Sequence, residues 1–365
     1  MERRKQLGLG FAALMLGIAS ALMAEPAGNA SAQQPGQEAL FNAGYKVIDL
    51  KYQKDGQEQT LTLAVWYPTE AQAGIYNYGG IIKGNVAPDA MPSAKNGPYP
   101  LLVFSHGYGG SGVSSVFFSE VLAARGWIVA CPDHHDQYSA VRIKTGQNKA
   151  FDRQLFLESS RKITNSTPDD RHKYLYRIDE ISAAIDGIVN SGDFGKLIDK
   201  KRIAVGGHSL GGFTALGVSG TIRERRDPRI KAVLLFSTGA GAYLFRSDEL
   251  SAVSIPSMLL MGEKERNQIR GSQTMSKLSD IIYNNLPAPK YFLEVRGGNH
   301  FSFNNRLSDN FSIIPLGGTE KQFEVIRSYS IAFLEKYVSG KQDQNKILEH
   351  SVPMLTRYIV KLPEE

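Results

Sequence analysis

Short runs of apolar residues recur through the middle of the chain, and the segments between them have the periodicity of helices. Strands that helices cover on both faces read as continuous apolar runs rather than alternating ones. The pattern therefore predicts a doubly wound α/β fold around a mostly parallel sheet. The expected strands are residues 100–107, 127–133, 202–209, 230–238, 256–262 and 291–298, and the expected helices are residues 116–124, 176–189, 211–217, 273–285 and 320–337.

Other segments depart from this rhythm. Residues 45–53 and 59–68 alternate apolar and polar residues, so we expect antiparallel strands at the N-terminal edge of the sheet. Residues 71–98 are rich in Gly, Pro and Asn and predict a long surface loop. Residues 134–175 are polar, basic and too long for a simple crossover. We interpret them as a cap insertion, with one helical face formed by Phe151, Leu155, Phe156 and Leu157.

Residues 1–32 have the three-part layout of a secretory signal, with basic residues, then an apolar run, then small residues. We expect cleavage after Ala24 or Ala32, a mature domain of residues 33–365, and export to the periplasm or the medium. An uncleaved membrane anchor is the alternative, because the apolar run is only slightly shorter than a bilayer span. The one cysteine, Cys131, gives an exported chain no internal disulfide.

The formal net charge is +6, but Lys and Arg are scattered along the chain rather than gathered in one run. We therefore expect no nucleic-acid partner. A mildly basic surface is compatible with an acidic substrate or with peripheral contact with a lipid or polymer surface, and salt would screen this attraction.

Residues Gly207 to Gly211, GHSLG, match the pattern G-x-S-x-G between an expected strand and an expected helix. Glycine neighbours lack a Cβ atom, so the strand and the helix can approach closely while the Ser209 hydroxyl stays exposed. An ordinary glycine turn is the alternative, since the chain has 36 glycines. The strand context and the additional Gly212 favour Ser209 as a nucleophile.

A serine hydroxyl needs a base to take its proton and a carboxylate to orient that base. His300 directly follows the last expected strand and is the expected base, whereas a loop histidine with a structural hydrogen bond is the alternative. Glu265 lies three residues beyond Gly262 at the end of a strand and is the expected acid, with Glu263 as the alternative. The histidines set aside as bases are His106, His134, His135 and His208.

Backbone amides of Tyr108 and Leu210 are the expected oxyanion hole, because acyl transfer needs donors for the developing negative charge. Tyr108 lies in a second glycine-rich turn, residues 104–112, at the position of an HGGG-type motif. A phosphate-binding loop is the alternative, but the turn lacks the lysine of that motif. We expect Tyr108, His208 and Phe301 to bind substrate. No metal and no organic cofactor is expected, because no His/Cys cluster has ligand spacing.

Together the segments FSHGYGG, GGHSLGG, MGEKE and GGNHFSF resemble the α/β-hydrolase superfamily. More narrowly, LTLAVWYPT, PLLVFSHGYGG and ACPDHHD are similar to bacterial proteins related to platelet-activating-factor acetylhydrolase and labelled predicted dienelactone hydrolases. True dienelactone hydrolases have cysteine where this chain has Ser209. The acetylhydrolases place their acid after the strand that follows the nucleophile, where this chain has Ser237 and Thr238. Gly107-Tyr108 and Asn299-His300-Phe301 are also similar to the oxyanion loop and the histidine loop of bacterial cutinases and polyester hydrolases.

This resemblance spans about Tyr45 to Tyr337 and implies a serine esterase with an α/β-hydrolase fold that works through an acyl-enzyme. With the signal layout at the N-terminus, we expect an exported enzyme whose α/β-hydrolase domain covers residues 33–365. The expected substrate is a small-molecule or lipid ester. A phospholipid acetylhydrolase, a cutinase-like polyester hydrolase, and a catalytically inactive hydrolase-like binding protein are the alternatives.

Overall fold

The computed structural model describes residues 40–364 except 80, 140–141, 145–152, 271 and 306–316. The expected signal segment, Phe151 and the side chain of Phe156 lie outside what is described. Within the described ranges, no helix is both long and apolar enough to cross a membrane.

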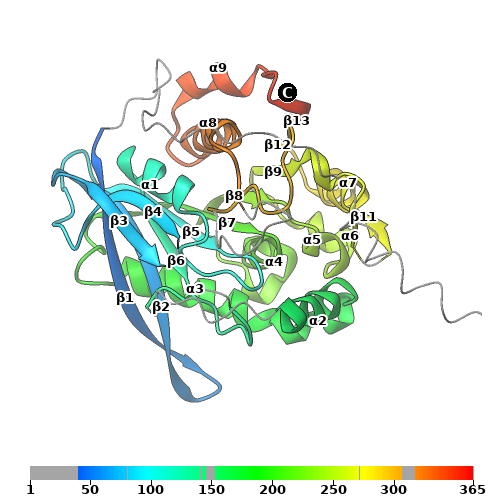
Figure 1. Cartoon of the computed structure of the whole chain (residues 1–365), viewed down its shortest axis with the longest axis horizontal. Helices are drawn as coiled ribbons and strands as arrows, with labels where there is room; N and C mark the ends of the chain where they lie inside the picture. The colour runs from blue at the N-terminus through cyan, green and yellow to red at the C-terminus, as the bar shows by residue number, and fades with distance from the viewer. Residues whose placement is uncertain are drawn as a thin grey trace, which may run out of the picture.

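The described strands form one eleven-stranded sheet and a separate two-stranded ribbon. They are β1 (Asn42–Lys54), β2 (Gln57–Thr69), β3 (Gly74–Gly79), β4 (Ile82–Pro88), β5 (Tyr99–Ser105), β6 (Ile128–Pro132), β7 (Ile198–His208), β8 (Ile230–Phe236), β9 (Ser257–Gly262), β10 (Ile269–Arg270), β11 (Gln273–Thr274), β12 (Lys290–Val295) and β13 (Leu355–Lys361). The sheet order is β13-β12-β9-β8-β7-β5-β6-β2-β1-β4-β3 (Figure 1).

The strands from β12 to β6 in this order are parallel, and β13 and β2 pair antiparallel with them on either side. Parallel neighbours end at the same edge of a sheet. The carboxyl ends of β5, β7, β8, β9 and β12 therefore meet along one edge, which is where open α/β sheets bind ligands. This confirms the predicted parallel core.

Helices cover both faces of the sheet (Figure 1). They are α1 (Val116–Ala124), α2 (Arg153–Thr164), α3 (Leu175–Val189), α4 (Leu210–Leu216), α5 (Ala240–Tyr243), α6 (Ser247–Leu250), α7 (Met275–Asn285), α8 (Glu320–Tyr337) and α9 (Asn345–Leu348). α1 and α8 pack on one face, and α3, α4 and α7 pack on the other. Along β5, Leu101 and Val103 enter one core while Leu102 and Phe104 enter the other.

The prediction of a surface loop over residues 71–98 is wrong, because this segment contains the β3–β4 hairpin. The hairpin extends the sheet beyond β1, so β1 and β2 are not its outermost strands. The Tyr78 hydroxyl connects the hairpin to the core, because it accepts a hydrogen bond from Trp66 Nε1 (2.8 Å) and donates one to Glu120 (2.7 Å). Strand β13 at the opposite edge was also not predicted.

Part of the predicted cap, residues 134–175, is described. It contains α2 and a 3₁₀ helix over Pro168–Tyr174, and α2 packs against α5. Leu155 of α2 is 40% exposed. That this segment acts as a cap over the site remains a prediction.

Candidate active site

Ser209 lies in the sharp turn between β7 and α4, with φ = 55°. A non-glycine residue at positive φ is strained, so its neighbours must leave room for the turn. A Cβ atom at Gly207 would lie 2.1 Å from the Gly211 carbonyl oxygen, and one at Gly211 would lie 2.0 Å from the Ser105 carbonyl oxygen. Glycine at both positions therefore lets β7, α4 and the end of β5 pack closely around the serine.

His300 lies in the loop after β12, and its Nε2 is 3.0 Å from Ser209 Oγ. The side chain is 16% exposed, so the imidazole is mostly enclosed but still reaches solvent. On its other side, Nδ1 lies 2.9 Å from Glu265 Oε2. The structure thus brings together the three residues that the sequence analysis selected.

Glu265 lies in the short 3₁₀ turn after β9 and is fully buried. Burial alone would raise the pKa of this carboxyl group, but the hydrogen bond and charge of His300, the Ser237 hydroxyl and the Gly262 amide together hold the pKa below its ordinary value. The Gly262 N–H donates to Oε1 at 2.9 Å, which leaves Oε2 for the imidazole. Glu265 therefore stays ionised beside His300.

Glu263, the alternative acid, does not join this group. Its Oε2 accepts a hydrogen bond from the Gly297 N–H (2.7 Å), so Glu263 stabilises the start of the loop that carries His300. The geometry favours Glu265 over Glu263 as the partner of the imidazole.

Ser237 is a member of the site that sequence reasoning missed. It follows β8 with φ = 47°, is fully buried, and donates to Glu265 Oε2 at 2.5 Å. Its Oγ also lies 2.6 Å from His300 Nδ1. The hydroxyl therefore bridges the carboxylate and the imidazole. A serine carries no sequence signal for this role, although its position at the end of a strand next to β9 places it at the right edge.

The two expected oxyanion donors belong to segments that lie next to the serine. Leu210 is the first residue of α4, where a backbone N–H has no partner within the helix. A Cβ atom at Gly107 would lie 3.2 Å from Ser209 Cβ, so the turn that carries Tyr108 lies directly against the nucleophile. The Tyr108 ring is half-buried and packs against the hydrophobic core on the face of the sheet that α3 and α4 cover.

Of the other expected substrate-binding residues, Phe301 is partly exposed beside the His300 ring, with centroids 5.6 Å apart. The geometry does not favour His208 as a substrate contact, because it is only 4% exposed. Its Nε2 donates to the His300 carbonyl oxygen (2.8 Å), and its Nδ1 lies 3.3 Å from Asn304 Nδ2. Burial and the charge of His300 lower the pKa of His208 to about 3. A neutral His208 thus supports the backbone of the His300 loop.

Within the described residues, no group of three or more His, Cys, Asp or Glu side chains is placed to hold a metal ion.

Comparisons with known proteins match most of the chain. The family profile described as platelet-activating factor acetylhydrolase, isoform II, matches residues 49–351. A platelet-activating factor acetylhydrolase from Gallus gallus is 27% identical over 68% of this chain, and the match spans 64% of the chicken protein's length. Cutinase 1 from Thermobifida cellulosilytica is 25% identical over 67% of this chain and 71% of its own.

A solved structure of a ferulic acid esterase from Streptomyces cinnamoneus has the same fold, with a TM-score of 0.64 over 89% of this chain and 95% of that chain. Its sequence identity is 21%, so this likeness supports the fold alone. The family profile matches more than half of the chain, and this leads to one assignment: the chain belongs to the platelet-activating factor acetylhydrolase, isoform II, family.

Proposed function

We propose that this chain hydrolyses carboxylic esters through a Ser-His-Glu triad. The observation that carries the proposal is the continuous chain of contacts from Glu265 through His300 to Ser209, with distances of 2.9 and 3.0 Å. Ser209 Oγ attacks the ester carbonyl carbon while His300 Nε2 takes the hydroxyl proton. The imidazolium that forms is stabilised by the buried Glu265 carboxylate.

The attack forms a new oxygen–carbon bond and leaves a negative charge on the former carbonyl oxygen. The amides of Tyr108 and Leu210 donate to this oxyanion. When it collapses, the ester bond breaks and His300 returns the proton to the departing alcohol. Water, deprotonated by the same imidazole, then attacks the acyl-enzyme and releases the acid and the free Ser209.

The substrate class is a small-molecule or lipid ester. The family match and the named chicken relative favour a phospholipid with a short acyl chain as one candidate, and the cutinase relative favours a polyester as the other. Release of a short acid from the sn-2 position of a phospholipid, measured against release of monomers from a polyester film, distinguishes the two. Export with cleavage of the signal segment after Ala24 or Ala32, and a hydrolase domain over residues 33–365 with a cap at about 134–175, belong to the same proposal.

The test uses Ser209→Ala with p-nitrophenyl acetate and a fluorophosphonate probe. Loss of a triad serine should lower turnover by several orders of magnitude and abolish covalent labelling. Ser111→Ala removes a buried serine of the neighbouring turn and serves as the labelling control. If the wild-type protein takes up no label and releases no nitrophenol, the non-catalytic binding protein becomes the better reading.

A further inference from the structure

The direction of the Tyr108 amide is fixed by the carbonyl group in the same peptide unit. A peptide unit is planar, and in the trans form its C=O and N–H point in opposite directions. The Gly107–Tyr108 bond is not among the cis peptides of the described chain. A group that binds the Gly107 carbonyl oxygen therefore also sets the direction of the Tyr108 N–H. That oxygen lies 2.7 Å from His106 Nδ1, and the Gly110 N–H also donates to it at 3.1 Å.

The proton of His106 must sit on Nδ1 for this contact to be a hydrogen bond. The backbone N–H of His134 donates to His106 Nε2 at 3.2 Å, so Nε2 is the acceptor and Nδ1 the donor. Burial and the nearby charges of Arg177 and His134 keep the pKa of His106 well below its ordinary value, which keeps the imidazole neutral. This tautomer satisfies both contacts. Arg177 Nη2 also lies 3.3 Å from Nδ1, but a guanidinium can only donate, so the shorter contact to the Gly107 carbonyl oxygen takes the Nδ1 proton and the Arg177 approach is not a hydrogen bond in this tautomer.

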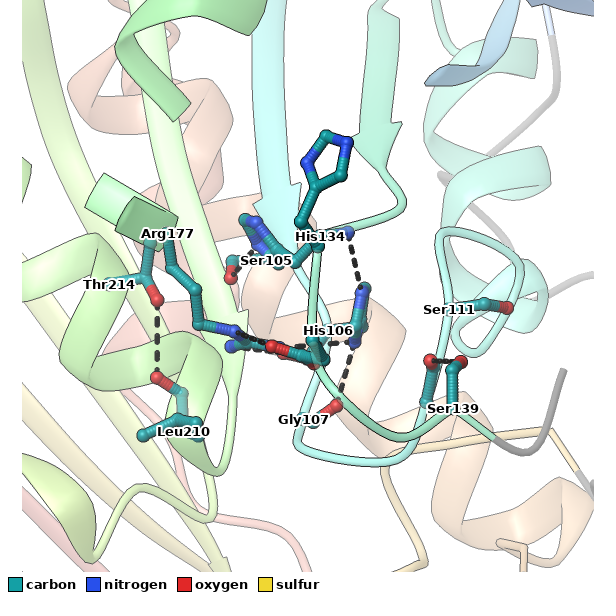
Figure 2. A network of polar contacts seen from close by, with 12 residues as sticks. Ser105, His106, Gly107, Ser111, His134, Ser139, Arg177, Leu210 and Thr214 are labelled. Carbon is teal, nitrogen blue, oxygen red and sulfur yellow. Dashed lines mark hydrogen bonds and ion pairs between the residues drawn. The ribbon is translucent and has the colours of Figure 1, made fainter. Parts of the chain in front are cut away.

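Arg177 of α3, which forms a buried ion pair with Asp136 from the segment after β6, contacts His106. Figure 2 shows Arg177 beside His106. Arg177 is fully buried, and its Nη1 donates to the His106 carbonyl oxygen at 2.9 Å. Its Nε and Nη2 donate to the two oxygens of Asp136 at 2.9 and 2.8 Å. Because the guanidinium binds Asp136 in a bidentate way, its orientation toward the His106 carbonyl is fixed.

One helical turn further along α3, Glu180 holds the segment after β6. Its Oε2 lies 2.6 Å from His134 Nδ1. On the other side of the ring, His134 Nε2 lies 2.7 Å from Ser105 Oγ (Figure 2). All three side chains of this second Ser-His-Glu chain are fully buried, so the Ser105 hydroxyl cannot meet a substrate. Its effect is to fix the end of β5, directly before His106.

We propose that His106 is a positioning residue that aims the Tyr108 amide at the oxyanion, and that Arg177 fixes His106 for this task. The proposal rests on the proposed esterase function, because an oxyanion must form for the amide to matter. The proposal gives a role to His106, a histidine that the triad does not use. It also distinguishes His106 from a purely structural histidine, since the aim of an amide affects the transition state more than the bound ester.

The test compares His106→Asn with His106→Gln. The Asn side-chain nitrogen can take the place of Nδ1 and donate to the Gly107 carbonyl, whereas the Gln nitrogen reaches the place of Nε2. We expect His106→Asn to retain kcat for p-nitrophenyl acetate within about threefold and His106→Gln to lose about 10- to 100-fold, part of the effect of removing an oxyanion donor. KM should change little in both. Binding of a trifluoromethyl ketone, whose adduct with Ser209 carries an oxyanion, should weaken in proportion to kcat/KM.

His172→Leu is the matched control, because His172 Nδ1 also contacts a backbone carbonyl, that of Asp169 (2.8 Å), on the exposed 3₁₀ helix. It should keep wild-type kcat. Equal kcat values for folded His106→Asn and His106→Gln would overturn the positioning role, as would a fall in thermal stability with unchanged kcat. Because Ser209→Ala is assayed alongside, an active Ser209→Ala would instead refute the proposed function itself.

Discussion

Replacing Glu265 by Gln tests the proposed acid with almost no change in side-chain shape. The Gly262 N–H donates to Oε1 at 2.9 Å, so the Gln carbonyl oxygen must occupy that position to accept it. The amide NH₂ is then placed where Oε2 now faces His300 Nδ1 at 2.9 Å. Two donors cannot share a hydrogen bond. His300 would therefore carry its proton on Nε2 instead of Nδ1. A protonated Nε2 cannot accept the proton of Ser209.

The expected loss in kcat/KM is about 10³- to 10⁴-fold, and the upper figure is the loss known for a triad Asp changed to Asn. At about 1.36 kcal/mol per factor of ten, this corresponds to about 4 to 5.5 kcal/mol of lost transition-state stabilisation. The assay is hydrolysis of p-nitrophenyl acetate under kcat/KM conditions, with thermal melts to show that the variant is folded. Glu263→Gln is the matched control and should retain activity within about threefold. A folded Glu265→Gln with more than a tenth of wild-type activity would refute the assignment.

Further substitutions test the parts of the site separately. Ser237→Ala removes the hydroxyl contacts to Glu265 and His300 but leaves the Glu265 charge, so kcat should fall about tenfold at most, far less than in Glu265→Gln. A loss of kcat as large as that of Glu265→Gln would contradict this. Gly211→Ala places a Cβ atom 2.0 Å from the Ser105 carbonyl oxygen and should cost about 3 kcal/mol in urea unfolding, whereas Gly192→Ala, with nothing within 4 Å, should change stability by less than about 0.5 kcal/mol. Arg177→Met leaves the buried Asp136 carboxylate without its charged partner, which should lower the free energy of unfolding by about 3 to 5 kcal/mol. Adding Asp136→Asn removes the uncompensated charge and should restore part of the lost stability. Burial alone would raise the pKa of Glu180, but hydrogen bonds from His134 and His135 lower it to about 2 from 4.5. The pKa in the folded state is thus below the unfolded value, so this stabilisation is present above pH 4.5 and is lost as pH falls toward 2. Glu180→Gln should be less stable than wild type at pH 7, and the difference in urea midpoint should narrow below pH 4.5.

Much of the fold could be predicted because parallel strands buried on both faces leave continuous apolar runs in the sequence. The β3–β4 hairpin left no such signal, since Gly74, Gly79 and Gly84 interrupt it and only one part of each strand is buried. It is held by contacts with residues distant in sequence, among them the hydrogen bond from Tyr78 to Glu120 and the pairing of β4 with β1. Local composition therefore indicated a loop where long-range contacts produce strands.

The candidate site also contains residues that the sequence could identify and residues that it could not. Ser209 could be selected from its motif and His300 from its place after the last strand, because both positions depend on the order of strands along the chain. His106 and Arg177 could not be linked, because their contact joins the turn after β5 to α3 across 71 positions. The catalytic roles of the selected residues remain proposals, and their proximity is what the structure adds.

The pairing of Ser237 with Glu265 follows from the arrangement of β8 and β9. These strands are parallel neighbours, with Phe236 opposite Leu260, so the residues that follow them reach the same imidazole nitrogen. A carboxylate at both places would put two like charges within hydrogen-bond distance, and one would have to be protonated. A hydroxyl at one place avoids this repulsion. It donates to the charged oxygen and accepts from the imidazole, so a single buried carboxylate can orient His300 without a competing charge.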